Sequence, residues 1–208
     1  IADLAIMMAG YIAVPFFPSL KGKELEFLID FGDVDLLFVG KIETWDNIKS
    51  YIPKDLPIIS FPNYKGCSVV DRGEQWFDFI NRNEPLHKPH TPKLSDLWTI
   101  IFTSGTTGNP KGVMLSHGGI LANCEGAQEI LFSLVKNEKP VFLTWLPLSH
   151  SYEHTVQYVQ ILLGAKVFYA ESLEKLLPNM AIAKPTIMTA VPRFYQNLYT
   201  CLLYTSDA

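Results

Sequence analysis

Cysteine is scarce in this sequence, and its spacing excludes two classes of small domain. Only three cysteines occur in 208 residues, and no two of them form a Cys-x-x-Cys pair. A disulfide framework or a zinc site built on paired cysteines is therefore not indicated. A reducing compartment is the expected environment, which points to a cytoplasmic protein.

Long hydrophobic runs and an excess of basic residues are also missing. The most apolar stretch, Leu4 to Phe17, has fourteen residues with Gly10 and Pro15 among them, which is too short to span a bilayer. Lysine and arginine number 17 against 21 acidic residues, a formal net charge of −4. This balance does not predict a polyanion-binding surface, so nucleic acid is not an expected partner. The sequence leaves open whether the protein associates with a membrane surface and whether it forms oligomers.

What the sequence does contain is an alternation of helical and strand-like patterns. With 48% hydrophobic residues the chain can bury a core. A helix ending at Met8 precedes an apolar strand at Tyr11–Val14, and a helix over Glu24–Phe31 precedes a strand at Val34–Val39. Such alternation predicts an α/β protein with a parallel sheet. Further strands are expected at Ile58–Phe61, Leu97–Phe102, Gly112–Leu115, Val141–Trp145, Val167–Tyr169 and Thr186–Ala190, and further helices at Gln75–Asn81, after Ser116, over Val156–Leu163, after Ser172 with a break at Pro178, and from Val191.

One proline-rich stretch interrupts this pattern. Glu84 to Lys93 contains three prolines and the histidines His87 and His90. Two histidines can bind a metal ion, but a solvated linker is the interpretation that the prolines favour.

The most informative stretch is Thr103-Ser104-Gly105-Thr106-Thr107-Gly108-Asn109-Pro110-Lys111-Gly112. It holds four hydroxyls, three glycines and one lysine directly after an apolar strand. Glycines allow backbone N–H groups to converge on an anion, and a lysine adds a mobile positive charge, so the stretch reads as a phosphate cradle. It does not fit the Walker A loop, because Pro110 stands where that motif has its second glycine. The alternative is a hydrophilic surface turn.

A second polar cluster follows the strand predicted at Val141–Trp145. Leu146-Pro147-Leu148-Ser149-His150-Ser151-Tyr152-Glu153-His154 brings two histidines, an acid and an aromatic residue to the end of a buried strand. This is where a substrate pocket is expected in an α/β fold. Taken alone, His150 is more simply a structural hydrogen-bonding residue.

These motifs together resemble those of the AMP-forming adenylate ligases, the superfamily of acyl-CoA synthetases, luciferases and peptide-synthetase adenylation domains. The glycine- and threonine-rich loop resembles the nucleotide-phosphate signature, with Leu115-Ser116-His117 as a matching flank. Leu146-Pro147-Leu148-Ser149-His150 resembles the next motif. Tyr152-Glu153-His154 and Ala190-Val191-Pro192-Arg193 resemble the long-chain acyl-CoA synthetase branch most.

The resemblance implies a fold and an extent. Residues 1–200 are expected to form part of the large N-terminal domain of the adenylate-forming ligase fold, with mostly parallel sheets flanked by helices. Residues 201–208 resemble the translation of a sequencing-library adapter and are treated as an artefact. The adenine- and ribose-binding segments and the catalytic lysine of the family fall beyond Thr200, so the 208 residues alone are expected to be inactive.

The resemblance also implies a reaction, in which a fatty carboxylate attacks Mg²⁺-ATP to give an acyl-adenylate and CoA then displaces AMP. His150 is expected to orient the carboxylate, and His154 falls where some relatives have an aromatic gate over the acyl tunnel. Two alternatives stay open: a ligase for another carboxylic acid, and a ligase-like binding protein without turnover. The residues expected to bind the ATP phosphates are Thr103, Ser104, Gly105, Thr106, Thr107, Gly108 and Lys111, with Thr107 also contacting Mg²⁺ and Lys111 also acting in catalysis.

Overall fold

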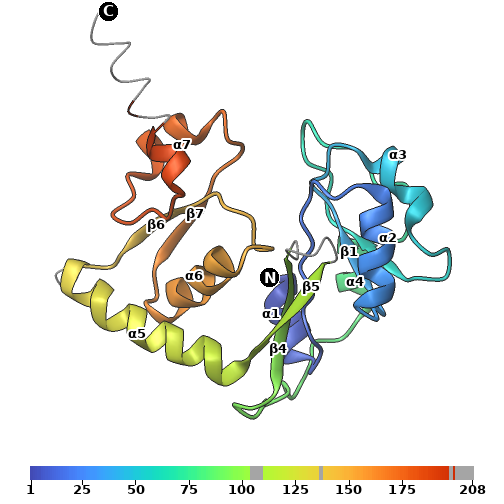
Figure 1. Cartoon of the computed structure of the whole chain (residues 1–208), viewed down its shortest axis with the longest axis horizontal. Coiled ribbons are helices and arrows are strands. Elements are labelled where there is room, and N and C mark those ends of the chain that lie inside the picture. The colour runs from blue at the N-terminus through green and yellow to red at the C-terminus, as the bar shows by residue number, and fades with distance from the viewer. Residues whose placement is uncertain (104–109, 136–137, 197–198, 200–208) are drawn as a thin grey trace, which may run out of the picture. The chain divides into compact units, whose positions relative to one another are not determined.

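The computed structural model describes residues 1–103, 110–135, 138–196 and 199. The chain divides into two compact units, Ile1–Gly119 and Ile120–Ala208, which are described separately. Both contain helices and parallel strand pairs (Figure 1), which confirms the α/β prediction. The ranges 104–109 and 201–208, which include most of the predicted phosphate loop and the predicted artefact tail, lie outside the described residues.

The first unit contains a parallel three-stranded sheet, in the order β1 (Leu37–Val39), β2 (Ile58–Ser60) and β3 (Glu74–Gln75). Helix α2 (Gly22–Phe31) packs its apolar stripe against this sheet, and helix α3 (Trp45–Ile48) completes the cluster. The spacing of Leu25, Leu28 and Ile29 predicts that they share one face of this helix, and the burial of all three confirms it. The core of this cluster is made by Leu25, Ile29, Leu37, Val39, Ile42, Trp45, Ile48, Ile52, Ile58 and Val70.

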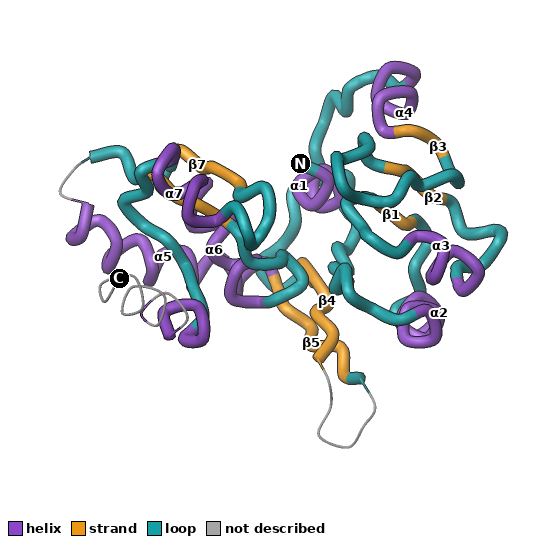
Figure 2. The backbone as a smooth tube through the Cα atoms, turned by 90° about the horizontal axis from the view of Figure 1, so that it is seen from above, coloured by secondary structure: helices purple, strands orange, loops and turns teal. Residues whose placement is uncertain are grey.

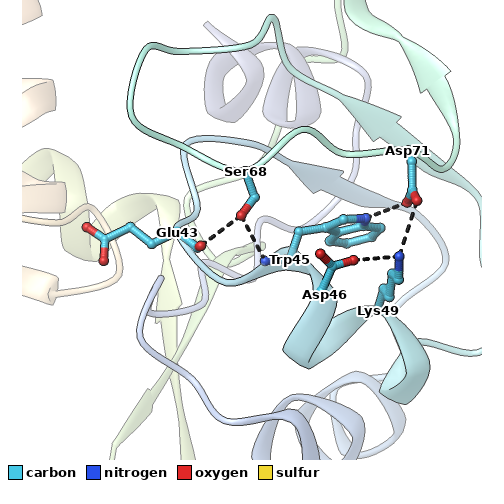
Figure 3. A network of polar contacts seen from close by, with 6 residues as sticks. All are labelled: Glu43, Trp45, Asp46, Lys49, Ser68 and Asp71. Atoms are coloured by element: carbon cyan, nitrogen blue, oxygen red, sulfur yellow. Dashed lines mark hydrogen bonds and ion pairs between the residues drawn. The ribbon is translucent and has the colours of Figure 1, made fainter.

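A polar network joins α3 to the segment before β3 (Figure 3). The indole N–H of the buried Trp45 donates to Asp71 at 2.6 Å, and the Lys49 ammonium, in the 3₁₀ helix η1 (Lys49–Tyr51), lies 3.2 Å from the same carboxylate. Lys49 also pairs with Asp46 at 2.6 Å. The indole hydrogen bond, followed by that from Lys49, holds the pKa of Asp71 below its ordinary value. The indole N–H, which is the only polar group in the side chain of this buried tryptophan, is thus hydrogen-bonded.

A second sheet in this unit is the antiparallel pair β4 (Leu97–Thr103) and β5 (Lys111–Ser116), visible as a long hairpin in Figure 2. This confirms the predicted buried strand and its return strand. The strand predicted at Tyr11–Val14 is wrong. Only Ala13 pairs there, in a single parallel bridge to Thr99, and the side chain of Tyr11 is 69% exposed.

Helix α5 (His117–Val135) follows β5 directly. The Ser116 hydroxyl accepts a hydrogen bond from the N–H of Gly119 at 3.2 Å, which confirms its predicted role as the N-cap. The helical spacing predicts that Leu121 and Cys124 lie on one buried face of α5, with Cys124 as a small core residue. Cys124 is buried, whereas the side chain of Leu121 is 48% exposed and does not share that face.

The second unit is built on the parallel pair β6 (Val141–Thr144) and β7 (Lys166–Tyr169), connected by helix α6 (Ser151–Leu162). Leu143 of β6 packs on Leu176 and Ala183 of helix α7 (Leu176–Ala183). In place of the strand predicted at Thr186–Ala190 there is one bridge, between Phe142 and Ile187.

Two further helix predictions need correction, and two others hold. Helix α7 begins at Leu176, so Pro178 lies in its first turn, where a missing N–H disrupts nothing, and does not break it. In helix α4 (Trp76–Arg82) the sequence predicts that Trp76, Phe77 and Ile80 face inward. The Trp76 ring does pack on that of Phe61, with centroids 5.2 Å apart, but the side chains of Phe77 and Ile80 are 62% and 45% exposed, so the prediction is wrong for these two. Helix α1 (Ala2–Met8) ends at Met8, as predicted. Residues 192–196 are helical, which agrees with the helix predicted from Val191.

Candidate functional site

The hairpin of β4 and β5 presents the two ends of the predicted phosphate loop. Thr103 and Lys111 are paired across the strands, and the Thr103 hydroxyl lies 3.5 Å from the carbonyl oxygen of Lys111. Both residues are exposed, so the ammonium and hydroxyl groups are available to a ligand. The other predicted phosphate-binding residues, Ser104, Gly105, Thr106, Thr107 and Gly108, lie outside the described residues.

Close packing around Gly112 fixes the strand that carries Lys111. A Cβ atom on Gly112 would lie 2.9 Å from Cγ2 of Ile100 and 3.3 Å from a ring carbon of Phe102. Separations this short are smaller than van der Waals contact, so only glycine fits between these side chains. The neighbouring Lys111 is therefore held at a defined place on β5.

The base of the hairpin is closed by backbone hydrogen bonds. The N–H of His117 donates to the carbonyl of Asp96 at 3.0 Å, and the N–H of Gly118 donates to that of Leu94 at 2.7 Å. Burial, partly opposed by the charge of Asp96, lowers the pKa of the His117 imidazole. The backbone hydrogen bond of His117 to Asp96, and not its side chain, is what holds the end of the hairpin.

In the second unit, His150 is the N-cap residue of α6. Its Nδ1 accepts a hydrogen bond from the backbone N–H of Tyr152 at 3.3 Å. A nitrogen that accepts carries no proton, so this geometry assigns the proton of the neutral ring to Nε2. Because His150 is exposed, its Nε2–H can donate to a ligand oxygen.

The first turn of α6 contains two fully buried ionisable side chains, Glu153 and His154, each 0% exposed. The hydroxyl of Thr189 donates to Oε2 of Glu153 at 2.8 Å. Burial raises the pKa of Glu153, and hydrogen bonds from Thr189 and Thr144 act in the opposite direction. The His154 ring lies 5.9 Å from the ring of Tyr158, centre to centre. Its predicted role as a gate stays a prediction.

Sequence reasoning grouped Glu153 with its motif but missed its buried position. Its partner Thr189 is 36 residues away in the sequence, so no local pattern reveals the contact. The predicted residues divide between the units: Thr103 and Lys111 belong to the first, and His150 and His154 to the second.

The described part of the chain shows neither a metal-binding cluster nor a membrane-spanning helix. Within residues 1–103, 110–135, 138–196 and 199, no group of three or more His, Cys, Asp and Glu side chains is arranged to hold a metal ion. In the same ranges, none of the helices has the length and apolar content needed to cross a membrane.

The fold is shared with solved adenylate-forming ligases. One of them is a putative long-chain-fatty-acid CoA ligase from Rhodopseudomonas palustris, with a TM-score of 0.74 and 18% sequence identity. The match covers 95% of this chain and 48% of the chain of that ligase. Another is O-succinylbenzoate coenzyme A synthetase (MenE) from Bacillus subtilis, in complex with ATP and magnesium, with a TM-score of 0.71 and 17% sequence identity. The match covers 95% of this chain and 48% of the chain of that synthetase. The molecule thus has the architecture of the N-terminal domain of adenylate-forming ligases.

Sequence comparison identifies the family. The family model described as "AMP-binding enzyme" matches residues 1–206, and the chain belongs to this family. Peroxisomal long chain acyl-CoA synthetase 6 of Arabidopsis thaliana is 30% identical over 98% of this chain, and human long-chain-fatty-acid–CoA ligase 1 is 28% identical over 90%. The chain spans 30% and 29% of the length of these two relatives.

Proposed function

We propose that this chain is part of a long-chain fatty acid:CoA ligase that forms AMP. Relatives named as long-chain acyl-CoA synthetases or ligases match nearly the whole chain at 26–30% identity, and this is the observation that carries the proposal. The substrates are then a fatty acid, ATP and CoA, with Mg²⁺ as the metal. Residues 1–200 belong to the N-terminal domain in this account, and the protein is cytoplasmic.

In the proposed reaction, Lys111 and the loop before it bind the β- and γ-phosphates of ATP. An exposed lysine paired with Thr103 across the strands, on a hairpin with tight packing at Gly112, suits a polyanionic ligand. Magnesium, for which Thr107 is the proposed contact, supplies further charge neutralisation when bound. The leaving pyrophosphate gains negative charge, so a fixed cation there favours the transition state over the ground state.

His150 is proposed to orient the acyl carboxylate. Its Nε2–H donates to one carboxylate oxygen, while the N-cap hydrogen bond at Nδ1 holds the ring. The other carboxylate oxygen is then free to attack the α-phosphorus. Because a carboxylate is already nucleophilic, the protein has to position it rather than deprotonate it. His154, buried behind this turn, is proposed to line the acyl-binding region.

The test uses the complete natural protein that contains this chain, with palmitate, ATP and Mg²⁺. Wild-type protein is expected to form an acyl-adenylate and release pyrophosphate, and Lys111→Ala should slow this step by roughly 10- to 1000-fold, as for the loss of one contact to developing charge. Lys23→Ala, an exposed lysine on α2, is the matched control and should keep the wild-type rate.

Two results would count against the proposal. If the wild-type protein activates only short, aromatic or amino acids, the long-chain assignment is wrong while the ligase assignment stands. If Lys111→Ala releases pyrophosphate as fast as Lys23→Ala, Lys111 has no part in adenylation.

A further inference from the structure

Thr189 forms hydrogen bonds to both ends of the segment that carries His150. Its carbonyl oxygen accepts from the indole N–H of Trp145 at 2.8 Å, at the start of the segment. Its hydroxyl donates to Glu153 at 2.8 Å, at the end of the segment. Segment 145–153, which runs from Trp145 through His150 to the third residue of α6, is therefore tied at both ends to one residue.

The bond at the far end is unusual for a helix start. Glu153 is the third residue of α6, where an acidic side chain commonly returns to the N-cap backbone. Here the side chain turns into the protein interior and accepts from Thr189 instead. The first hydrogen bond of the helix runs from the N–H of His154, the residue after Glu153, to the carbonyl of the N-cap residue His150 at 3.0 Å. The buried Glu153 side chain is thus connected to His150 through one turn of backbone.

Thr189 is itself held against the sheet. Three residues earlier, the Thr186 hydroxyl accepts from the N–H of Val141 at 2.9 Å, and the N–H of Ile187 donates to the carbonyl of Val141 at 3.1 Å. The Trp145 ring packs on Phe194 with centroids 5.3 Å apart. Segment 145–153 is thus fixed at both ends to a neighbour that is registered with β6.

We propose that Thr189 is a positioning residue for the adenylation reaction, because its hydroxyl, through Glu153, holds the His150 imidazole where it meets the acyl carboxylate. This inference rests on the proposed function. Small displacements of a group that orients a reactant lower the rate steeply, and a shift of about 1 Å can reduce it by a factor of about 100.

Thr189→Val tests the hydroxyl alone, because valine keeps the shape and leaves the backbone bond to Trp145 intact. In the complete protein, kcat for acyl-adenylate formation should fall about 10- to 100-fold, while KM for ATP stays within about twofold. Thr189→Ser, which keeps the hydroxyl, should restore most of the rate. Ser60→Ala is the matched control, since it removes a buried hydroxyl, which donates to the carbonyl of Glu74 at 3.2 Å in the first unit, and leaves segment 145–153 and its anchors untouched.

Hydrogen exchange measured by mass spectrometry gives a readout that does not depend on turnover. Peptides covering residues 145–155 should exchange faster in Thr189→Val than in wild type, and at the wild-type rate in Ser60→Ala. Should Thr189→Val fail to fold, Thr189→Ala, which also removes the hydroxyl and keeps the backbone bond to Trp145, should give the same faster exchange and lower kcat.

Unchanged exchange and kcat in Thr189→Val, or in Thr189→Ala if that variant is needed, would overturn the proposal. Equal loss of kcat in Thr189→Val and Ser60→Ala would also overturn it, because the effect would then be general destabilisation. If wild-type protein makes no acyl-adenylate, the proposed function fails and so does the catalytic role of Thr189, whereas the exchange result still reports whether the hydroxyl holds the segment.

Discussion

The same substitution, glycine to alanine, is expected to act in opposite directions at Gly112 and Gly126. At Gly112 a new Cβ would lie 2.9 Å from Cγ2 of Ile100, a stiff β-branched side chain, and 3.3 Å from the ring of Phe102. At Gly126, inside α5, a new Cβ would meet nothing within 4 Å.

The two magnitudes follow from these surroundings. Overpacking of this kind costs about 1–3 kcal/mol, which exceeds the gain of about 0.4–1 kcal/mol from restricting the unfolded backbone. Gly112→Ala should therefore lower the free energy of unfolding by about 1–2 kcal/mol. Gly126→Ala should raise it by about 1 kcal/mol, because alanine is the better helix former.

Urea unfolding of the complete protein measures both changes against wild type. The midpoint should move down for Gly112→Ala and up for Gly126→Ala, with the slope unchanged in each case. A stabilised Gly112→Ala variant would refute the claim that β4 leaves no room beside Gly112, and with it the argument that packing fixes the place of Lys111.

Two further predictions concern the helix starts. Ser116→Ala should lower the stability of α5 by about 1 kcal/mol, seen as faster hydrogen exchange in its first turn; unchanged exchange would mean that the hydroxyl bond to Gly119 contributes nothing. Glu153→Gln should flatten the pH dependence of unfolding. Burial raises the pKa of Glu153 above its ordinary value of 4.5, so the native state holds the proton more tightly than the unfolded chain. The stability that this proton contributes is therefore complete below pH 4.5 and is lost as pH rises through the pKa of the folded state. Thermal midpoints of wild type and Glu153→Gln between pH 4.5 and 8 should therefore diverge, and parallel curves would contradict the assignment.

The sequence predicted those elements that local periodicity determines. The stripe of Leu25, Leu28 and Ile29 identified α2, and an apolar run followed by a polar loop and a second run identified the hairpin of β4 and β5. The Ser116 cap was also predicted, because an N-cap depends on residues only three positions apart.

Predictions failed where the environment of a residue is set by distant parts of the chain. Tyr11–Val14 has the composition of a strand, but only Ala13 finds a backbone partner, at Thr99, so the segment does not become one. Phe77 has a helical spacing that suggests burial, yet no element covers that side chain within the described residues. Glu153 is the clearest case, because its buried position depends on a hydroxyl 36 residues away.

The most direct measurement for the central claim is a crystal structure of the complete protein with ATP and Mg²⁺. The β- and γ-phosphates are expected to lie against the loop between Thr103 and Gly112, with the Lys111 ammonium in contact with a phosphate oxygen. ATP bound elsewhere, with that loop and Lys111 free of ligand, would contradict the claim.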